Sequence, residues 1–586
     1  MHESVPQTDP TRDQLDPEHG ALPSPRLRRR LIFLAALLLA LLLAVFLPPL
    51  IGVTRFERRI ATSIGASIGR PVHFERAALS LLPLPGFTLD NFVVEEDPAF
   101  GSEPILRAGQ VRVTLRLSAL WRPRVEFSRI SLTAGPSGVA PSVNLVHTAT
   151  GRWNLEGILL QASRIPAAPT AQRYAGPAPR FPYIEATGAR INLKLDQEKT
   201  PFALTDADFA LWLPEPGQWR FRLEAHPART DTAPADTGAL RVEATLGTAP
   251  TLGQVPIDLR ATWQDAQLGG LTRLLLGRDA GLRGDLSLSL RVLGALDHAA
   301  LAANLQLAHA RRADFVPPRL LSLEASCQAV AQNSFHAFSN LECHWPPADS
   351  SSRSVLILAA AVPDVRRPSE SSASLTLPAL PAATLLDWLR AATPHPPTGL
   401  RATGTLAGAL AWSPTPPPSD RAPSRHRQIP PPPPTWSGEL EFSGESLQTP
   451  ALGPDPIPLG DILLRSTSDG SPTTANFDLL PVLLPLGGKQ PATLEGHFDA
   501  TGYTLHLTGP ALPARLLALG DAIPQLGEGL RELLDPPQIA PPATAPPPDD
   551  PAVVPTHFDL TATRPWGGPQ TWHQTAPPPR HHRPRH

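Results

Sequence analysis

Apolar residues occupy every second position in stretch after stretch of this 586-residue chain. The first such stretch places Val111, Val113, Leu115 and Leu117 on one side of an extended backbone, with polar residues between them. A period of two is typical of β-strands that bury one face and wet the other. The same alternation returns at residues 191–195, 219–223, 240–246, 255–263, 286–292, 440–442 and 503–507. We therefore predict a mainly β fold: an elongated, curved antiparallel sheet with one N-terminal transmembrane helix and a few short helices.

Composition excludes several other classes of protein. The 74 prolines and 41 glycines make up about a fifth of the chain, and only 18% of residues are charged. A coiled coil or a long helical array needs more charge and fewer prolines. Two cysteines are too few for a disulfide-dense or cysteine-rich zinc protein. A net charge of −2 gives no reason to expect nucleic acid as a partner.

The alternation does not decide what the apolar face contacts. A two-layer β-sandwich shows the same period, because its two apolar faces close on each other. The face formed by Val111, Val113, Leu115 and Leu117 is therefore either the lining of an open groove or part of a closed core.

The N-terminal region predicts a membrane anchor. Residues 31–53 contain no charged side chain, and this length is enough to span a bilayer. The run is too long for the apolar part of a cleaved signal peptide. Arginines at 26 and 28–30 precede it and favour a cytoplasmic N-terminus. We expect a signal anchor, with everything after about residue 54 exported.

Short helices are expected between the strands. Phe56, Ile60, Ile64 and Ile68 recur at every fourth position, which predicts a one-sided helix over 54–69. Further helical segments begin near residues 268, 382 and 514, and the last two follow the same string, Pro-Ala-Leu-Pro-Ala. This spacing indicates a degenerate repeat of a multi-strand block followed by a short helix.

Composition shifts divide the chain into eight segments. We expect a disordered cytoplasmic N-terminus at 1–30, the anchor at 31–53, a first β region at 54–160, a linker at 161–180, a repetitive β region at 181–412, a Pro-rich insert at 413–435, a β/helix block at 436–535 and a Pro-rich, partly disordered tail at 536–586.

The sequence carries no recognisable catalytic arrangement. Nucleotide-binding glycine motifs, metalloprotease and Cys-x-x-Cys patterns and the Gly-x-Ser-x-Gly elbow are all missing from it. We predict no enzyme, no catalytic or metal site and no cofactor. Cys327 and Cys343 fall on the same face of two neighbouring strand patterns, so a disulfide between them is possible in an oxidising compartment; two buried free thiols are the alternative.

A predicted anchor with a short helix is followed by Gly69-Arg70-Pro71-Val72, by the strand patterns at 87–94 and 108–121, and by Gly151-Arg152-Trp153-Asn154. In this order of features the first 160 residues resemble the AsmA family of bacterial envelope proteins. The resemblance implies anchoring in the bacterial inner membrane, with the bulk of the chain in the periplasm. The family-motif positions are Gly69, Arg70, Gly151, Trp153 and Asn154. The C-terminal part departs from the family pattern because it is Pro-rich.

The resemblance implies a role in outer-membrane biogenesis. It implies a curved β-sheet with an apolar groove and the membrane and phospholipid as partners, with lipid bound or transferred between the inner and outer membranes. The alternative is a periplasmic scaffold that contacts outer-membrane assembly components and carries no lipid.

Overall fold

The computed structural model describes most of the chain. The described residues are 25–46, 54–80, 84–116, 127–158, 181–196, 198–215, 217–249, 251–315, 320–347, 353–393, 399–413, 435–450, 455–467, 476–499, 501–534 and 555–574. The predicted linker at 161–180 and nearly all of the Pro-rich insert lie outside them.

The helices are few and mostly short. They are α1 (Pro25–Phe46), α2 (Thr54–Ile68), α4 (Leu268–Leu276), α5 (Ala382–Ala392), α6 (Pro513–Ala522), α7 (Pro524–Gly527) and α8 (Leu530–Leu534), with single 3₁₀ turns at Leu252–Gln254 and Pro368–Glu370. The four helices predicted from residues 54, 268, 382 and 514 are thereby confirmed. Within the described part of the chain, no helix combines the length and the apolar character needed to cross a membrane. Residues 47–53 of the predicted anchor are not among those described.

Strands make up the rest of the fold. The N-terminal strands are β1 (Val72–His73), β2 (Arg76–Ser80), β3 (Gly86–Val94), β4 (Leu106–Leu115), β5 (Phe127–Thr133), β6 (Ser142–His147), β7 (Tyr183–Leu195), β8 (Glu198–Glu215) and β9 (Gln218–Arg229). The middle strands are β10 (Ala239–Leu246), β11 (Pro256–Gln267), β12 (Leu282–Ala295), β13 (His298–Arg312), β14 (Leu321–Gln332), β15 (Ala337–Trp345), β16 (Leu356–Val362), β17 (Ser372–Pro381) and β18 (Arg401–Ser413). The C-terminal strands are β19 (Thr435–Gln448), β20 (Ile457–Thr467), β21 (Asn476–Leu484), β22 (Ala492–Phe498), β23 (Gly502–Ala511), β24 (Thr556–Pro565) and β25 (Thr571–Gln574).

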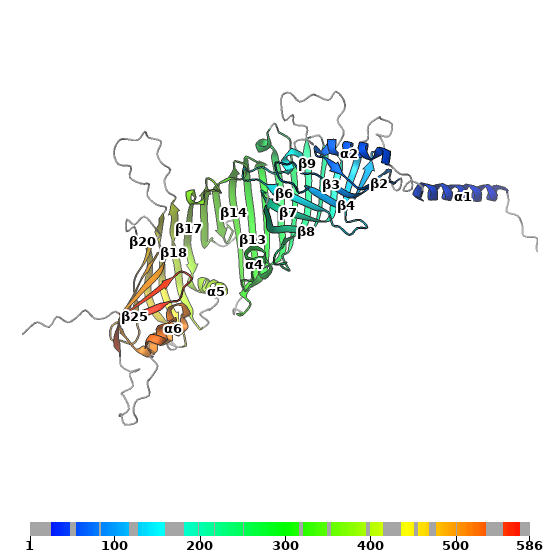
Figure 1. Ribbon diagram of the computed structural model, residues 1–586. Helices are drawn as coiled ribbons and strands as arrows, with labels where there is room; N and C mark the ends of the chain where they lie inside the picture. Colours follow the sequence, from blue (N-terminus) through cyan, green and yellow to red (C-terminus); the bar gives the residue numbers. More distant parts are fainter. Residues whose placement is uncertain are drawn as a thin grey trace, which may run out of the picture.

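All 25 strands belong to one long sheet (Figure 1). From β7 to β25 each strand pairs antiparallel with the next in the chain. We predicted an antiparallel sheet, but the sheet is mixed, because β7 pairs parallel with both β5 and β6. These two short strands lie end to end between β4 and β7, so the chain has to cross back before it enters β7.

Strand formation continues into the C-terminal tail. Residues 536–586 are Pro-rich, yet β24 pairs with β23 along its whole length and β25 adds a further edge strand. The ordered sheet therefore extends well beyond residue 535, and Trp572 is buried against it.

Helices recur along the sheet at a regular interval. α4 follows β11, α5 follows β17 and α6 follows β23, so six strands separate each helix from the next. All three lie along the same long edge of the sheet, the lower edge in Figure 1. The predicted repeat of a strand block plus a short helix is thus a six-strand unit.

Candidate functional site

Strand register aligns apolar side chains across the middle of the sheet. Directly paired residues on neighbouring strands project to the same face. Following these pairs from β9 to β18 gives a continuous line, the apolar row: Leu223, Val242, Ala261, Leu290, Ala303, Cys327, Cys343, Leu358, Leu375 and Leu410. No member of the row is charged.

The opposite face of the same strands is polar. One residue along from the apolar row, the pairs join Glu224, Arg241, Thr262, Ser289, Asn304, Ser326 and His344. Arg241 forms an ion pair with Glu224 at 3.0 Å across two of these strands. From β9 to β15 the sheet is therefore amphipathic, with one face suited to water and one to apolar material. Beyond β15 the same line continues through Ile357, Thr376 and Ala409, so the second face is less polar there.

The apolar face is closed at its two ends. At the N-terminal end, Ile60 and Ile64 of α2 join a core that also contains Leu89, Val111 and Val113. At the C-terminal end, helices α6 and α8 contribute Leu516, Leu519 and Leu530 to a second core. Its residues from β20–β25 are Leu459, Val482, Leu484, Ala492, Leu505, Leu507, Ala511, Phe558, Leu560, Ala562 and Trp572.

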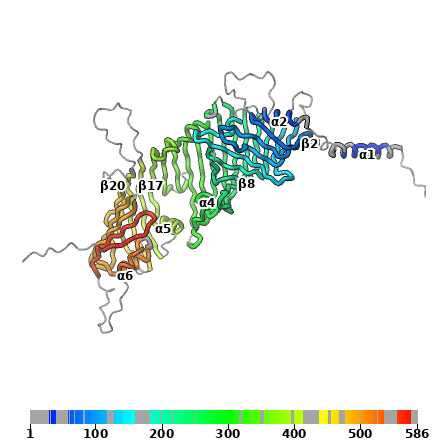
Figure 2. Tube along the Cα trace, in the orientation of Figure 1, coloured from blue at the N-terminus to red at the C-terminus, as the bar shows by residue number. Residues whose placement is uncertain are grey.

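Between these two cores the apolar face is only partly covered. The buried side chains there form small clusters, such as Ile257, Val292 and Ala299. Most members of the apolar row are half-buried, and Leu358 is 36% exposed. The helices that reach this region, α4 and α5, are short and sit at one edge, as the tube in Figure 2 also shows. A long apolar surface is therefore open to a ligand in the middle of the sheet.

Helix α5 packs onto this face near the edge. Its Ala391 shares a cluster with Ala310 and Leu321 of β13 and β14, although the helix follows β17 in the chain. Trp388 meets Trp345 of β15 edge to face, with ring centroids 6.0 Å apart. α5 therefore contacts β13, β14 and β15 and borders the apolar face.

The face predicted from β4 lies in the closed N-terminal core. Val111 and Val113 are fully buried, Leu115 is half-buried, and Leu117 is outside the described residues. The physical reason is local: α2 follows the predicted anchor directly and folds its isoleucines onto these strands. The same core takes in Leu223 of β9, with Val242 of β10 packed against it, so the open part of the apolar face begins beyond β10.

Two of the family-motif positions, Arg70 and Asn154, meet in one buried polar cluster. Asn154 is 0% exposed, and its Oδ1 accepts a hydrogen bond from the Val146 amide at 3.1 Å. Its Nδ2 donates one hydrogen bond to Asn144 O at 2.8 Å and another to Glu96 Oε2 at 2.5 Å. Arg70 reaches the same place from the end of α2, with its Nη2 3.8 Å from Glu96 and its Nη1 3.0 Å from Asp97.

Electrostatics hold this cluster together. Hydrogen bonds from the Ala99 amide and from Arg70 lower the pKa of Asp97.

Gly69 (φ 77°) turns the chain out of α2, and Gly151 (φ 85°) makes the turn before Asn154. Trp153 remains 45% exposed and packs on the His147 ring, whose centroid is 4.7 Å away. The two motifs thus fix the end of α2 to the first strands.

Glu96 is a member of this cluster that the sequence analysis missed. Its side chain is 2% exposed. The signal was present, since Glu95, Glu96 and Asp97 follow a strand pattern directly, and a buried arginine such as Arg70 needs an acidic partner.

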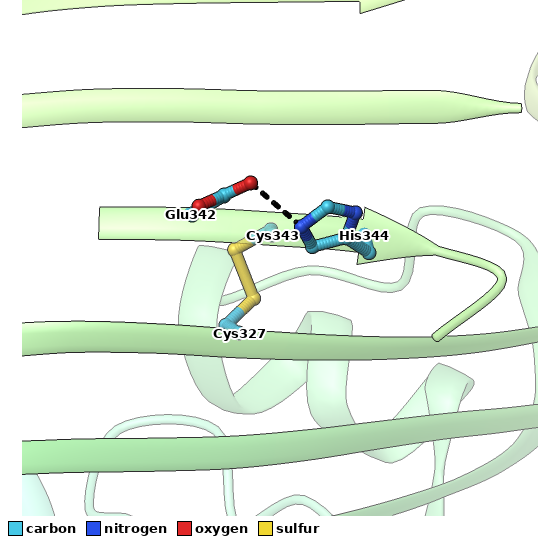
Figure 3. The surroundings of a disulfide bond; sticks show 4 residues. All are labelled: Cys327, Glu342, Cys343 and His344. Carbon is cyan, nitrogen blue, oxygen red and sulfur yellow. Dashed lines mark hydrogen bonds and ion pairs between the residues drawn. A yellow bond between two sulfur atoms is a disulfide. The ribbon is translucent and has the colours of Figure 1, made fainter. Parts of the chain in front are cut away.

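The two cysteines are directly opposite each other in the middle of the apolar row. Cys327 on β14 pairs with Cys343 on β15, and their sulfur atoms are joined in a disulfide (Figure 3). On either side of Cys343, Glu342 Oε1 and His344 Nε2 lie 2.8 Å apart on the polar face. The disulfide links the two strands at half-buried positions.

In the described ranges, no three His, Cys, Asp or Glu side chains gather as a metal site.

A model of the AsmA family matches residues 25–196, which include the polar cluster and much of the N-terminal core. Comparison with curated proteins and with solved structures returned no match.

Proposed function

We infer from the AsmA family domain at residues 25–196 that this chain holds phospholipid on the open apolar face of its sheet and serves lipid exchange between the inner and outer bacterial membranes. The observation that carries this proposal is the apolar row, which runs uncharged from β9 to β18 in a region without a second layer of strands.

The chemistry of the face suits acyl chains. Each methylene group moved from water onto an apolar surface is worth about 0.8 kcal/mol, so two acyl chains need an extended apolar path. Half-buried leucine, valine and alanine side chains supply that path, while the polar face stays in water. Headgroups can remain at the rim. Such a role needs binding and no reactive residue.

The proposed location follows from the N-terminus. The uncharged run at 31–53 and its preceding arginines support a single anchor in the inner membrane, with the N-terminus in the cytoplasm and the sheet in the periplasm. The Cys327–Cys343 disulfide suits an oxidising compartment of this kind.

A second candidate is a periplasmic scaffold for outer-membrane protein assembly. The closed cores at both ends favour it, because they stabilise the sheet without any ligand. In that case the open middle face would contact a protein rather than lipid.

Lipid analysis of the purified full-length protein tests the proposal. We expect native mass spectrometry in mild detergent to detect phospholipid at one or more molecules per chain. Leu358→Asp, which puts a charge on an exposed part of the apolar row, should lose most of this lipid. Ser374→Asp, at the neighbouring β17 position on the polar face, is the matched control and should retain it. Lipid-free wild-type protein would favour the scaffold.

A further inference from the structure

One carboxyl group enters the apolar face. In β19, Phe442 pairs with Ile462, and after a bulge Glu445 pairs with Gly460. Ile462 and Gly460 are two residues apart on β20 and share a face, which also holds Leu464 opposite Leu440. Glu445 therefore projects onto the apolar side of the sheet, three residues before the end of β19.

Glycines flank this carboxyl group on both neighbouring strands. A Cβ atom on Gly404 of β18 would lie 2.8 Å from Glu445 Oε1, so a larger residue there would displace the carboxyl group. A Cβ atom on Gly460 of β20 would meet nothing within 4 Å, so the space beside that glycine is open. Both strands next to Glu445 thus carry a residue without a side chain at this level.

Across the described ranges, no basic side chain balances the charge of the Glu445 carboxyl group. Glu445 is 5% exposed, and among the same residues its Oε1 has no hydrogen-bond partner. Leaving a buried polar atom unpaired costs about 1–3 kcal/mol, and more when it is charged. A leucine at this position would avoid that cost, so an external partner is a physical reason for an acid here.

We propose that Glu445 recognises the primary ammonium group of a phospholipid head group, and so selects aminophospholipids on the apolar face. This inference rests on the proposed function. An ammonium group carries three N–H donors and a positive charge, and charge-assisted hydrogen bonds are about twice as strong as neutral ones. The niche lies near the strand ends that α5 and α6 border, where a head group sits when its acyl chains lie along the sheet.

A competition between head groups tests this assignment. Full-length protein is incubated with vesicles holding equal amounts of ethanolamine and glycerol phospholipids with identical acyl chains, and the bound lipid is extracted and counted. We expect about fivefold enrichment of the ethanolamine lipid, which corresponds to about 1 kcal/mol. Glu445→Gln, equal in shape, should bring the ratio to about one without reducing total lipid. Glu439→Gln, an exposed residue of the same strand paired with Arg465, should leave the ratio unchanged.

A second probe does not depend on any variant. Replacing ethanolamine by choline keeps the positive charge but removes all three N–H donors, so enrichment over the glycerol lipid should fall. Bound lipid without head-group preference, or a preference that Glu445→Gln retains, would overturn the role of Glu445 and leave the lipid function standing. A wild-type protein that binds no lipid would overturn both.

Discussion

Asn154 and Glu445 are both buried polar side chains, but their surroundings are opposite. Asn154 satisfies its carbonyl and amide groups within the N-terminal cluster and joins α2, β3 and β6 through Arg70 and Glu96. Glu445 keeps an unpaired oxygen. A satisfied polar group fixes one arrangement of the chain, whereas an unsatisfied one lowers stability and is suited to an external partner.

Replacing Asn154 by alanine should loosen the N-terminal cluster. The change leaves the Val146 amide and Glu96 Oε2 without the Asn154 side chain as a partner, and we expect a loss of about 2–4 kcal/mol in local stability. Hydrogen exchange of peptides covering residues 142–154 measures this loss. Arg152→Ala, two residues away, removes an ion pair with Glu156 and a cation–π contact with the Phe100 ring, and should cost less than about 1 kcal/mol. Equal effects of the two variants would contradict a stabilising role of Asn154 in the N-terminal cluster.

Glu445→Gln should change the pH dependence of stability. Burial raises the pKa of Glu445 above its ordinary value of 4.5, so between that value and the folded pKa the folded state holds a proton that the unfolded state has lost. Wild-type stability therefore falls as pH rises through this window. The glutamine variant lacks this loss, so its melting temperature should exceed that of the wild type at pH 8 and approach it near pH 4. A difference independent of pH would show that titration of Glu445 does not contribute.

At the scale of single elements, local signals identified the helices and strands but not their partners. The period of four over 54–69 and the Pro-Ala-Leu-Pro-Ala strings predicted α2, α5 and α6, because a helix is determined by residues close in sequence. The bulge that turns Glu445 inward, and the meeting of Arg70 with Asn154, depend on contacts between distant segments. Periodicity contains no information about these.

Loss of the disulfide should destabilise the β14–β15 hairpin. The bond closes a loop of 16 residues, for which chain entropy gives about 3 kcal/mol. We expect the Cys327→Ser, Cys343→Ser double variant to show faster hydrogen exchange in β14 and β15, while β7 and β8 exchange as in the wild type. Unchanged exchange in the hairpin would mean that the neighbouring strands alone hold it.

At the scale of the whole molecule, the sheet is a chain of similar units. Roughly two dozen strand positions at about 4.8 Å extend for about 110 Å along the sheet. Alternation predicted an amphipathic sheet but could not distinguish an open groove from a closed sandwich, since both show a period of two. The structure has both: cores closed by helices at the ends and an open face between them.

Removing one six-strand unit should give a shorter protein that still folds. Gly281-Leu282-Arg283 and Gly399-Leu400-Arg401 occupy the same place after α4 and α5, so deleting residues 283–400 joins equivalent points. β18 then takes the place of β12 with its apolar residues on the same face. Small-angle scattering should show a molecule shorter by about 29 Å, with its β content per residue preserved. Aggregation of this variant would mean that the units depend on one another.

The consecutive pairing of β7 to β25 also determines how the chain can acquire its structure. Each new strand finds its partner in the strand made just before it, and most of the loops to be closed are short. The connections from β18 to β19 and from β23 to β24 are longer. Near the N-terminus the pairing skips strands: β1 pairs with β3, β4 with β6, and β7 in parallel with β5 and β6. Once β7 is in place, the sheet can grow by one hairpin at a time in the direction of synthesis, with its newest edge always ready for the next strand.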